Sequence, residues 1–132
     1  MKRVVTWSAM LIVSMFLFSG CGNLSSTQGC QVRNPDINQQ YSGACKNGLA
    51  EGFGKATGRD VYVGEFVEGE PDGQGEYRWT GESRWKGDVN KGEWKHGDRT
   101  LGTYTFSSGV IYIGSFKGTS HHGLGVMAIR KG

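Results

Sequence analysis

The chain has 132 residues, of which 23 are glycine and 20% are charged, and its formal net charge is +3. Two of the 15 basic residues, Lys2 and Arg3, lie near the start, which leaves 13 basic against 12 acidic side chains in the remainder. That balance lacks the concentrated basic surface of a nucleic-acid binder. The length suits one small domain, and we expect no nucleic-acid partner.

The first predicted element is a targeting signal. Two basic residues precede a short apolar run at 10–18, and the small residues Ser19 and Gly20 follow it. This order is that of a secretory signal peptide. The run is shorter than the roughly 20 apolar residues that a transmembrane helix needs. Residues 1–20 are therefore predicted to be a signal peptide and not a membrane span.

Cys21 directly follows these small residues. The segment 18–21, Phe-Ser-Gly-Cys, resembles the lipobox of bacterial lipoproteins, whose usual first residue is leucine. The resemblance implies that Cys21 becomes the acylated first residue of a mature protein held on a membrane by two or three acyl chains. Gly22 is not the aspartate that favours inner-membrane retention, so the outer membrane is favoured in a Gram-negative cell. The alternative is an ordinary secreted protein that is cleaved nearby.

The next segment is polar. Residues 21–40 are predicted to be the lipidated N-terminus and a flexible tether, because Ser, Thr, Gln and Asn dominate them. Cys30 and Cys45 are an even pair in an exported protein, which predicts a disulfide. A bridge over a loop of about 15 residues contributes roughly 3 kcal/mol and would pull the tether over the exposed end of the domain. The alternative, a redox or nucleophilic cysteine, lacks a nearby histidine.

From residue 41 onward an aromatic residue recurs with a glycine two positions later and a Gly-x-Gly pair downstream. The copies at 41–54 and 62–75 are in strict register. We read the third copy from Trp85, with extra residues at 94–99, and the fourth from Tyr112. A fixed period of this kind indicates a repeat architecture.

Within a copy, the alternation of Tyr62, Gly64 and Phe66 has the period of a strand, and 73–79 shows the same period. Between them, residues 70–72 are predicted to form a turn. Each copy is therefore a predicted β-hairpin. A single hairpin cannot bury its face alone, but stacked hairpins can, and inward glycines let neighbouring rings lie against the backbone.

The pattern YxGxxxxGxxxGxG at 41–54 and 62–75 resembles the MORN repeat (membrane occupation and recognition nexus), with altered copies from Trp85 and Tyr112. The resemblance covers residues 41–132. It implies an all-β fold, an elongated twisted antiparallel sheet of about four stacked hairpins, with an aromatic-lined groove on one face. Where MORN repeats accompany catalysis, a separate domain performs it, so we expect that this chain is not an enzyme.

The sequence offers no convincing catalytic, cofactor or metal site. The Gly-x-Gly pairs lack the following helix and the lysine of phosphate-binding loops. His121 and His122 are neighbours whose side chains usually diverge, and a metal needs three or four converging ligands. The carboxylates of 65–76 fall mostly at outward or turn positions. We therefore expect no catalytic residue, no cofactor and no metal.

The aromatic side chains are the candidate site. A single-layer sheet leaves one face without a covering layer, so part of that face stays available to a partner. We expect a membrane-anchored cell-envelope lipoprotein that acts as a non-catalytic interaction or scaffold module for a protein or peptide. The alternative is an envelope protein that binds glycan or lipid through the same groove. The candidate groove residues are Tyr62, Phe66, Tyr77, Trp79, Trp85, Tyr104, Phe106, Tyr112 and Phe116.

Overall fold

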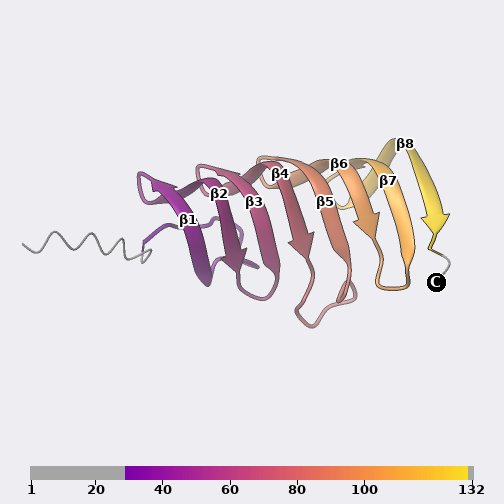
Figure 1. The fold of residues 1–132 in the computed structure, drawn as a ribbon, viewed down its shortest axis with the longest axis horizontal. Helices are drawn as coiled ribbons and strands as arrows, with labels where there is room; N and C mark the ends of the chain where they lie inside the picture. The colour runs from indigo at the N-terminus through magenta and orange to yellow at the C-terminus, as the bar shows by residue number, and fades with distance from the viewer. Residues whose placement is uncertain (1–28, 131–132) are drawn as a thin grey trace, which may run out of the picture.

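The computed structural model describes residues 29–130, which form one antiparallel sheet whose eight strands follow chain order (Figure 1). Each strand pairs with the next, so β1 and β8 are the edges of an open sheet. The predicted all-β stack of hairpins is confirmed. The predicted signal peptide and Cys21 lie outside the described residues. The strands are β1 (Gln40–Lys46), β2 (Leu49–Thr57), β3 (Val61–Val67), β4 (Glu70–Arg78), β5 (Val89–Lys95), β6 (Asp98–Thr105), β7 (Val110–Lys117) and β8 (Ser120–Ile129).

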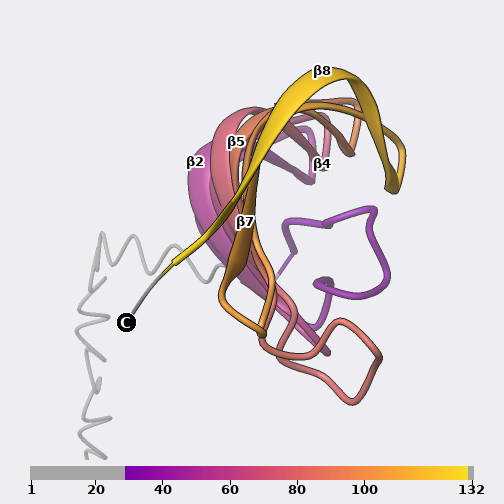
Figure 2. The same ribbon diagram turned by 90° about the vertical axis from the view of Figure 1, so that its right-hand side faces the viewer.

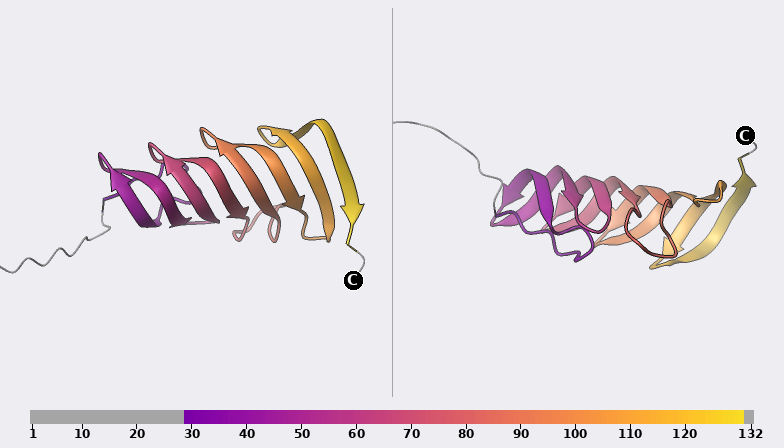
Figure 3. Two further views of the ribbon diagram at one scale, coloured as in Figure 1. Left: turned by 45° about the horizontal axis from the view of Figure 1, so that its top comes forward. Right: turned by 90° about the horizontal axis from the view of Figure 1, so that it is seen from below.

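The sheet is long in the direction in which the strands follow one another, and the strands themselves bend (Figures 1 and 3). Seen along its length, the sheet is a trough with one open side (Figure 2). The aromatic side chains lie on the concave face, where they form two clusters of buried residues. Because no second sheet within residues 29–130 covers this face, these rings must supply most of the core themselves.

Three hairpins close with two-residue turns in which both residues have positive φ. The turns are Asn47–Gly48, Glu68–Gly69 and His96–Gly97. This backbone is that of a type I′ turn, whose twist matches the twist of the strands that it joins. The glycine at the second turn position is therefore what the tight reversal requires.

The turn predicted at 70–72 is wrong, because these residues are the start of β4. Phe66 pairs with Pro71 and Gly64 pairs with Gly75, so the register shifts between the two pairs. Residues 72–74 therefore form a β-bulge opposite a single residue of β3. A bulge uses the same small and acidic residues as a turn, and the sequence pattern did not distinguish the two.

The third hairpin starts later than the sequence reading placed it. Gly92 pairs with Gly102, as the paired glycines of the other hairpins do. Asn90 therefore takes the position that tyrosine holds in the other three hairpins. Trp94 takes the position of a phenylalanine in the second and fourth. The repeat is preserved in its backbone while its leading ring is replaced by an amide.

The aromatic residue and glycine that suggested an earlier start, Trp85 and Gly87, lie in the connection 79–88 between β4 and β5. Gly87 has φ of 91° there, which is a loop conformation and not that of a strand. The extra residues of the third copy are thus in this connection and not at 94–99. The two residues imitate the repeat pattern without taking part in it.

Residues 30–39, here called the strap, are not the flexible tether that the composition predicted. Val32 and Ile37 are buried in the same cluster as the rings of the first two hairpins. A disulfide joins Cys30 to Cys45, with the two Cα atoms 5.7 Å apart. The apolar side chains of the strap are few, but the open concave face gives them a surface on which to pack.

Backbone hydrogen bonds hold the strap at both sides of the trough. The amide of Arg33 donates to the carbonyl of Gly69 at 2.8 Å, at one row of turns. The amide of Asp60 donates to the carbonyl of Asp36 at 2.9 Å, at the opposite row. The strap therefore crosses the open side of the trough over the first two hairpins (Figure 2).

Candidate functional site

The concave face carries a continuous series of aromatic contacts along the length of the sheet. Neighbouring ring centroids in this series lie between 4.6 and 6.3 Å apart, mostly in edge or tilted arrangements. Such geometries are the favoured ones for aromatic pairs. In order of contact the rings are Tyr41, Phe66, Tyr62, Trp94, Tyr77, Trp79, Tyr104, Phe116 and Tyr112.

Most of the predicted groove residues belong to the core of this face. Trp79 and Phe106 are half-buried and pack against the clusters, so they offer the accessible aromatic surface. Trp85 is 36% exposed, lies in the β4–β5 connection beneath the Arg84 guanidinium, and belongs to neither cluster. The structure therefore removes Trp85 from the candidate groove. The buried members are Tyr62, Phe66, Tyr77, Tyr104, Tyr112 and Phe116.

The leading tyrosine of a hairpin lies over its paired glycines. A Cβ at Gly64 or Gly75 would overlap the Tyr62 side chain, so only glycine fits beneath this ring. The Tyr62 hydroxyl donates to the carbonyl of Glu65 at 3.1 Å. Burial, followed by the nearby Glu65 carboxylate, raises the pKa of Tyr62. Tyr112 repeats the arrangement in the fourth hairpin.

Two buried aspartates were missed by the sequence reading, which looked for carboxylates at 65–76. Asp60 accepts hydrogen bonds from the Tyr77 hydroxyl at 3.0 Å and from the amides of Thr80 and Gly81. Its side chain has no exposed surface. A carboxylate enclosed by donors in this way holds a loop in place, and its lone pairs are occupied by the fold.

Asp88 does the same in the following hairpin. Its carboxylate accepts from the Tyr104 hydroxyl at 2.6 Å and from the Ser107 amide at 2.7 Å. Burial and then the bond to Asp88 raise the pKa of Tyr104. The sequence contained a signal for both aspartates, because an Asp-Val pair precedes the leading position of the second hairpin and of the third.

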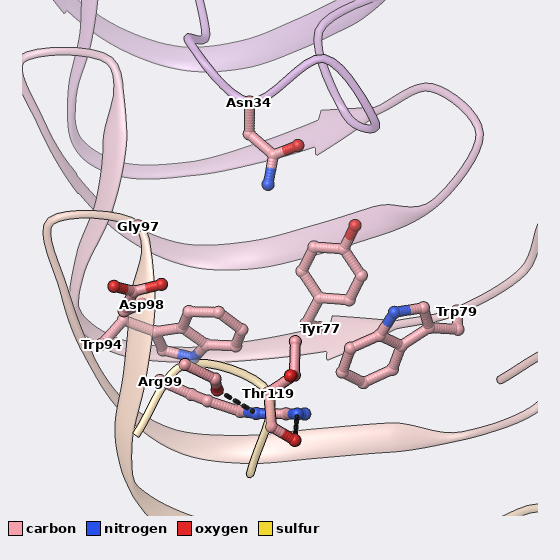
Figure 4. A pocket seen from close by; sticks show the side chains of 9 residues that line it. Asn34, Tyr77, Trp79, Trp94, Gly97, Asp98, Arg99 and Thr119 are labelled. Carbon is pink, nitrogen blue, oxygen red and sulfur yellow. Dashed lines mark hydrogen bonds between the residues drawn. The ribbon is translucent and has the colours of Figure 1, made fainter. Parts of the chain in front are cut away.

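A cavity of about 200 Å³ opens on the concave face beside the third hairpin (Figure 4). Three aromatic rings form one part of its wall, and the Arg99 side chain runs along another part (Figure 4). The strap contributes a single residue to its rim. Neither Trp94 nor Arg99 was a predicted site residue, although Trp94 stands four positions after Asn90, as Phe66 does after Tyr62. The lining residues are Asn34, Tyr77, Trp79, Trp94, Gly97, Asp98, Arg99, Gly118 and Thr119.

The Arg99 guanidinium is inserted among the rings. The Cζ atom of Arg99 lies 4.9 Å from the centroid of the Tyr104 ring and 5.5 Å from the centroid of the Trp79 ring. Nε donates to the carbonyl of Gly118 at 3.2 Å and Nη2 to that of Thr119 at 3.0 Å. Burial lowers the pKa of Arg99, against the opposing effect of Tyr104. Arg99 thereby fixes the β7–β8 turn over the cavity and gives the site a positive charge.

His121 and His122 lie in β8. The His121 ring packs on Tyr112 with a centroid distance of 4.0 Å. Among residues 29–130, no three His, Cys, Asp or Glu side chains are grouped as metal ligands would be. The same range contains no helix of the length and apolar character that crossing a bilayer requires.

Comparison with known proteins gives one family and one set of relatives. The family model for the MORN repeat matches residues 41–60, 62–84 and 112–132, and leaves out the third hairpin. The chain is 36% identical over 90 residues to Alsin of Rattus norvegicus and 34% identical over 90 residues to Alsin of Homo sapiens. Each match covers 66% of this chain but only 6% and 5% of the respective relative.

Proposed function

The chain carries MORN repeats, modules that typically take part in protein or membrane interactions, and from this premise we propose that it is a lipid-anchored, non-catalytic interaction module of the cell envelope. The concave aromatic face is its binding surface, and the partner is a protein segment or peptide. One observation carries the proposal: a polypeptide segment, the strap, already lies in this trough and is bound to the first two hairpins.

The contacts of the strap support this choice of partner. Its backbone bonds to the turn rows at Gly69 and Asp60, and the Ile37 side chain is fully buried among the rings. Backbone bonds supply affinity for a polypeptide segment, and a buried apolar side chain supplies selectivity. The partner that we propose is a polypeptide segment that inserts an apolar side chain beside the half-buried rings of Trp79 and Phe106.

The polar groups of this face support a binding role over a catalytic one. The buried carboxylates Asp60 and Asp88 have their oxygens occupied by tyrosine hydroxyls and backbone amides. A general acid or base must instead reach a substrate proton. The chemistry that the face offers to a partner is therefore aromatic contact and hydrogen bonding.

The anchoring part of the proposal rests on the lipobox-like segment that ends at Cys21. Cells that express the full chain are expected to retain it in the membrane fraction, whereas Cys21→Ser releases it into the soluble fraction or leaves it unprocessed. Metabolic labelling with palmitate should mark the wild-type protein and not the variant. Unchanged fractionation and labelling of the variant would refute the anchor.

The binding part is tested by recovery of the partner. Trp79→Ala removes one of the two accessible rings of the trough, and affinity purification from cells is expected to recover the partner poorly. Trp85→Ala is the matched control, because it removes a tryptophan outside the face. Equal recovery with both variants, with normal folding by circular dichroism, would refute the role of the trough.

A glycan or lipid ligand is the second candidate, and the cavity beside Trp79 and Trp94 is the observation that favours it. Tryptophan fluorescence titrated with peptidoglycan fragments and with lipid vesicles separates the two classes. A saturable response to either one would assign the face to that ligand.

A further inference from the structure

A row of paired glycines crosses the whole sheet. Each strand contributes one glycine, and that glycine is the partner of the corresponding glycine in the next strand. The row ends at Gly125, because β8 is an edge of the sheet. A further strand that matches the rest of the sheet would place another glycine opposite Gly125. In chain order the row consists of Gly43, Gly54, Gly64, Gly75, Gly92, Gly102, Gly114 and Gly125.

Strand β8 lies at the end of the sheet opposite to β1, and no strand within residues 29–130 pairs with its outer side (Figure 1). All ten of its residues are exposed. Segment 123–129 has neither a charged residue nor a proline, two features that usually protect an edge strand from pairing. The register shift between β7 and β8 does not block pairing either, because β2 and β4 have the same shift and each pairs with a following strand.

Large apolar side chains of β8 are exposed on both faces of the sheet. Met127 is the partner of Tyr112 and therefore lies on the concave side, where it is 59% exposed. By the alternation of a strand, Leu124 and Val126 lie on the convex side, where they are 97% and 65% exposed. Apolar surface thus lies on either side of an unpaired edge. A strand added to this edge would cover both sides at once.

A second copy of the chain can place a glycine opposite Gly125 in two ways. In head-to-tail pairing this glycine is Gly43 of β1, and counting outward along antiparallel strands brings Val126 opposite Ser42. In two-fold pairing it is Gly125 of the second copy, and Val126 lies opposite Leu124. The exposed side chains of β1 are polar or small, so the two-fold arrangement is the one that matches apolar with apolar. It also closes after two copies, whereas head-to-tail pairing leads to open filaments.

The two-fold register repeats a pairing that the sheet already uses between hairpins. Gly52 of β2 has φ of 73° and is the partner of Phe66 in the next strand. The pairing of β4 with β5 has the same form, with a tryptophan in place of the phenylalanine. Gly123 has φ of 65° and stands two positions before the glycine row, as Gly52 does. Two-fold pairing brings Met127 of the second copy opposite Gly123, so a large apolar side chain again faces this glycine.

We propose that two copies of this chain associate through their β8 strands, antiparallel, with Gly125 opposite Gly125 at a two-fold axis. Segment 123–129 of each copy forms the interface. The Tyr112 side chain lies over Gly125 on the concave side in each copy, so both concave faces lie on the same side of one continuous sheet. The inference needs neither the lipid anchor nor a partner in the trough, and its failure would leave the proposed function untouched.

The first test is disulfide crosslinking in the register that the two-fold axis dictates. Two full-length copies with different tags, one with Leu124→Cys and the other with Val126→Cys, are expressed together and then oxidised. Phe53→Cys with Val126→Cys is the matched control, because Phe53 is the equivalent Gly-x-Gly residue of β2 and is 69% exposed. We expect at least about tenfold more adduct carrying both tags than in the control, because facing residues of paired strands have Cβ atoms only about 4.5–5.5 Å apart.

The second test is the recovery of one tagged copy with the other. Val126→Lys should lower this recovery at least about tenfold, because it places two ammonium groups against apolar side chains at the interface. Leu101→Lys is the matched control, since this residue is 53% exposed on the convex side of β6, away from the edge. Both side chains are exposed in the single chain, so circular dichroism should show an unchanged fold.

Several results would overturn the proposal. One is the lack of an adduct with both tags from Leu124→Cys and Val126→Cys, and another is an equal yield from the Phe53→Cys control. Wild-type recovery of Val126→Lys would show that the copies associate through another surface. An adduct between Ser42→Cys and Val126→Cys would show head-to-tail pairing instead. If Leu124→Cys formed an adduct with a different protein and none with its own copy, the edge would belong to that protein.

Discussion

The hydroxyl of Tyr77 lies 3.0 Å from Oδ2 of Asp60, a carboxylate with no exposed surface. This bond joins strand β4 to the turn that precedes β3. The other oxygen of Asp60 accepts the amides of Thr80 and Gly81, so the same carboxylate also holds the start of the β4–β5 connection. The rings of the concave face are thus held by their packing and also by the hydrogen bonds of Asp60 at one row of loops.

Asp60→Ala is expected to lower the free energy of unfolding by about 3–5 kcal/mol, because it leaves a buried hydroxyl and two amides without an acceptor. Urea denaturation followed by circular dichroism measures the loss. Glu82→Ala is the control: this carboxylate pairs with Lys86 on the surface, and its removal should cost less than about 1 kcal/mol. Similar losses in the two variants would contradict the role of Asp60.

Alkaline pH should unfold the domain through its tyrosines. Burial, followed by the neighbouring carboxylate, raises the pKa of Tyr77 and of Tyr104. Since the folded state holds these protons more tightly than the unfolded state, stability is fully present below the ordinary tyrosine pKa of about 10 and falls as pH rises above it. Tyrosinate absorbance at increasing pH should appear together with the loss of circular dichroism. Ionisation of all tyrosines in a folded protein would contradict this prediction.

Loss of the disulfide should loosen the strap. Cys30 and Cys45 are separated by 15 residues, and a bridge of that span contributes roughly 3 kcal/mol. Cys30→Ser with Cys45→Ser should lower the free energy of unfolding by about that amount and speed amide exchange at Arg33. Reductant should reproduce the effect in the wild type and add nothing in the double variant. Unchanged exchange at Arg33 would show that the strap is held by its other contacts alone.

Gly75→Ala should destabilise the second hairpin by about 3 kcal/mol, because a Cβ there would overlap the Tyr62 ring. The test is a double-mutant cycle with Tyr62→Leu, read by thermal denaturation. If the ring is the obstacle, the alanine should cost clearly less in the leucine background. Strict additivity of the two substitutions would place the cause elsewhere.

The sequence predicted the sheet because its period-two alternation and repeated glycines are properties of the backbone and of one face. The copies that open with Tyr41 and Tyr62 define the register fully. The start of the third copy was predicted wrongly because Asn90 replaces the ring that marks a start, while Trp85 and Gly87 have the same spacing in a loop. An alignment on the Asp-Val pairs at 60–61 and 88–89 would have placed the start correctly.

The site was less predictable than the fold. Aromatic composition identified the concave face, but it did not separate buried rings from the half-buried Trp79 and Phe106, since that depends on neighbours across strands. Arg99 was missed for a similar reason: its role arises from contacts with a turn far along the chain at Gly118. The strap was predicted to be a tether because the sequence has only two apolar residues there, Val32 and Ile37. It does not reveal that the open concave face lies beside them and can bury both side chains.

The most direct test of the binding role places a photo-crosslinking amino acid at position 79 in living cells. A second variant with the crosslinking amino acid at position 85 instead is the matched control. Adducts are identified by mass spectrometry of the membrane fraction. The account predicts one discrete protein adduct from position 79 and none of that identity from position 85. The same adducts from both positions, or no protein adduct from position 79, would contradict it.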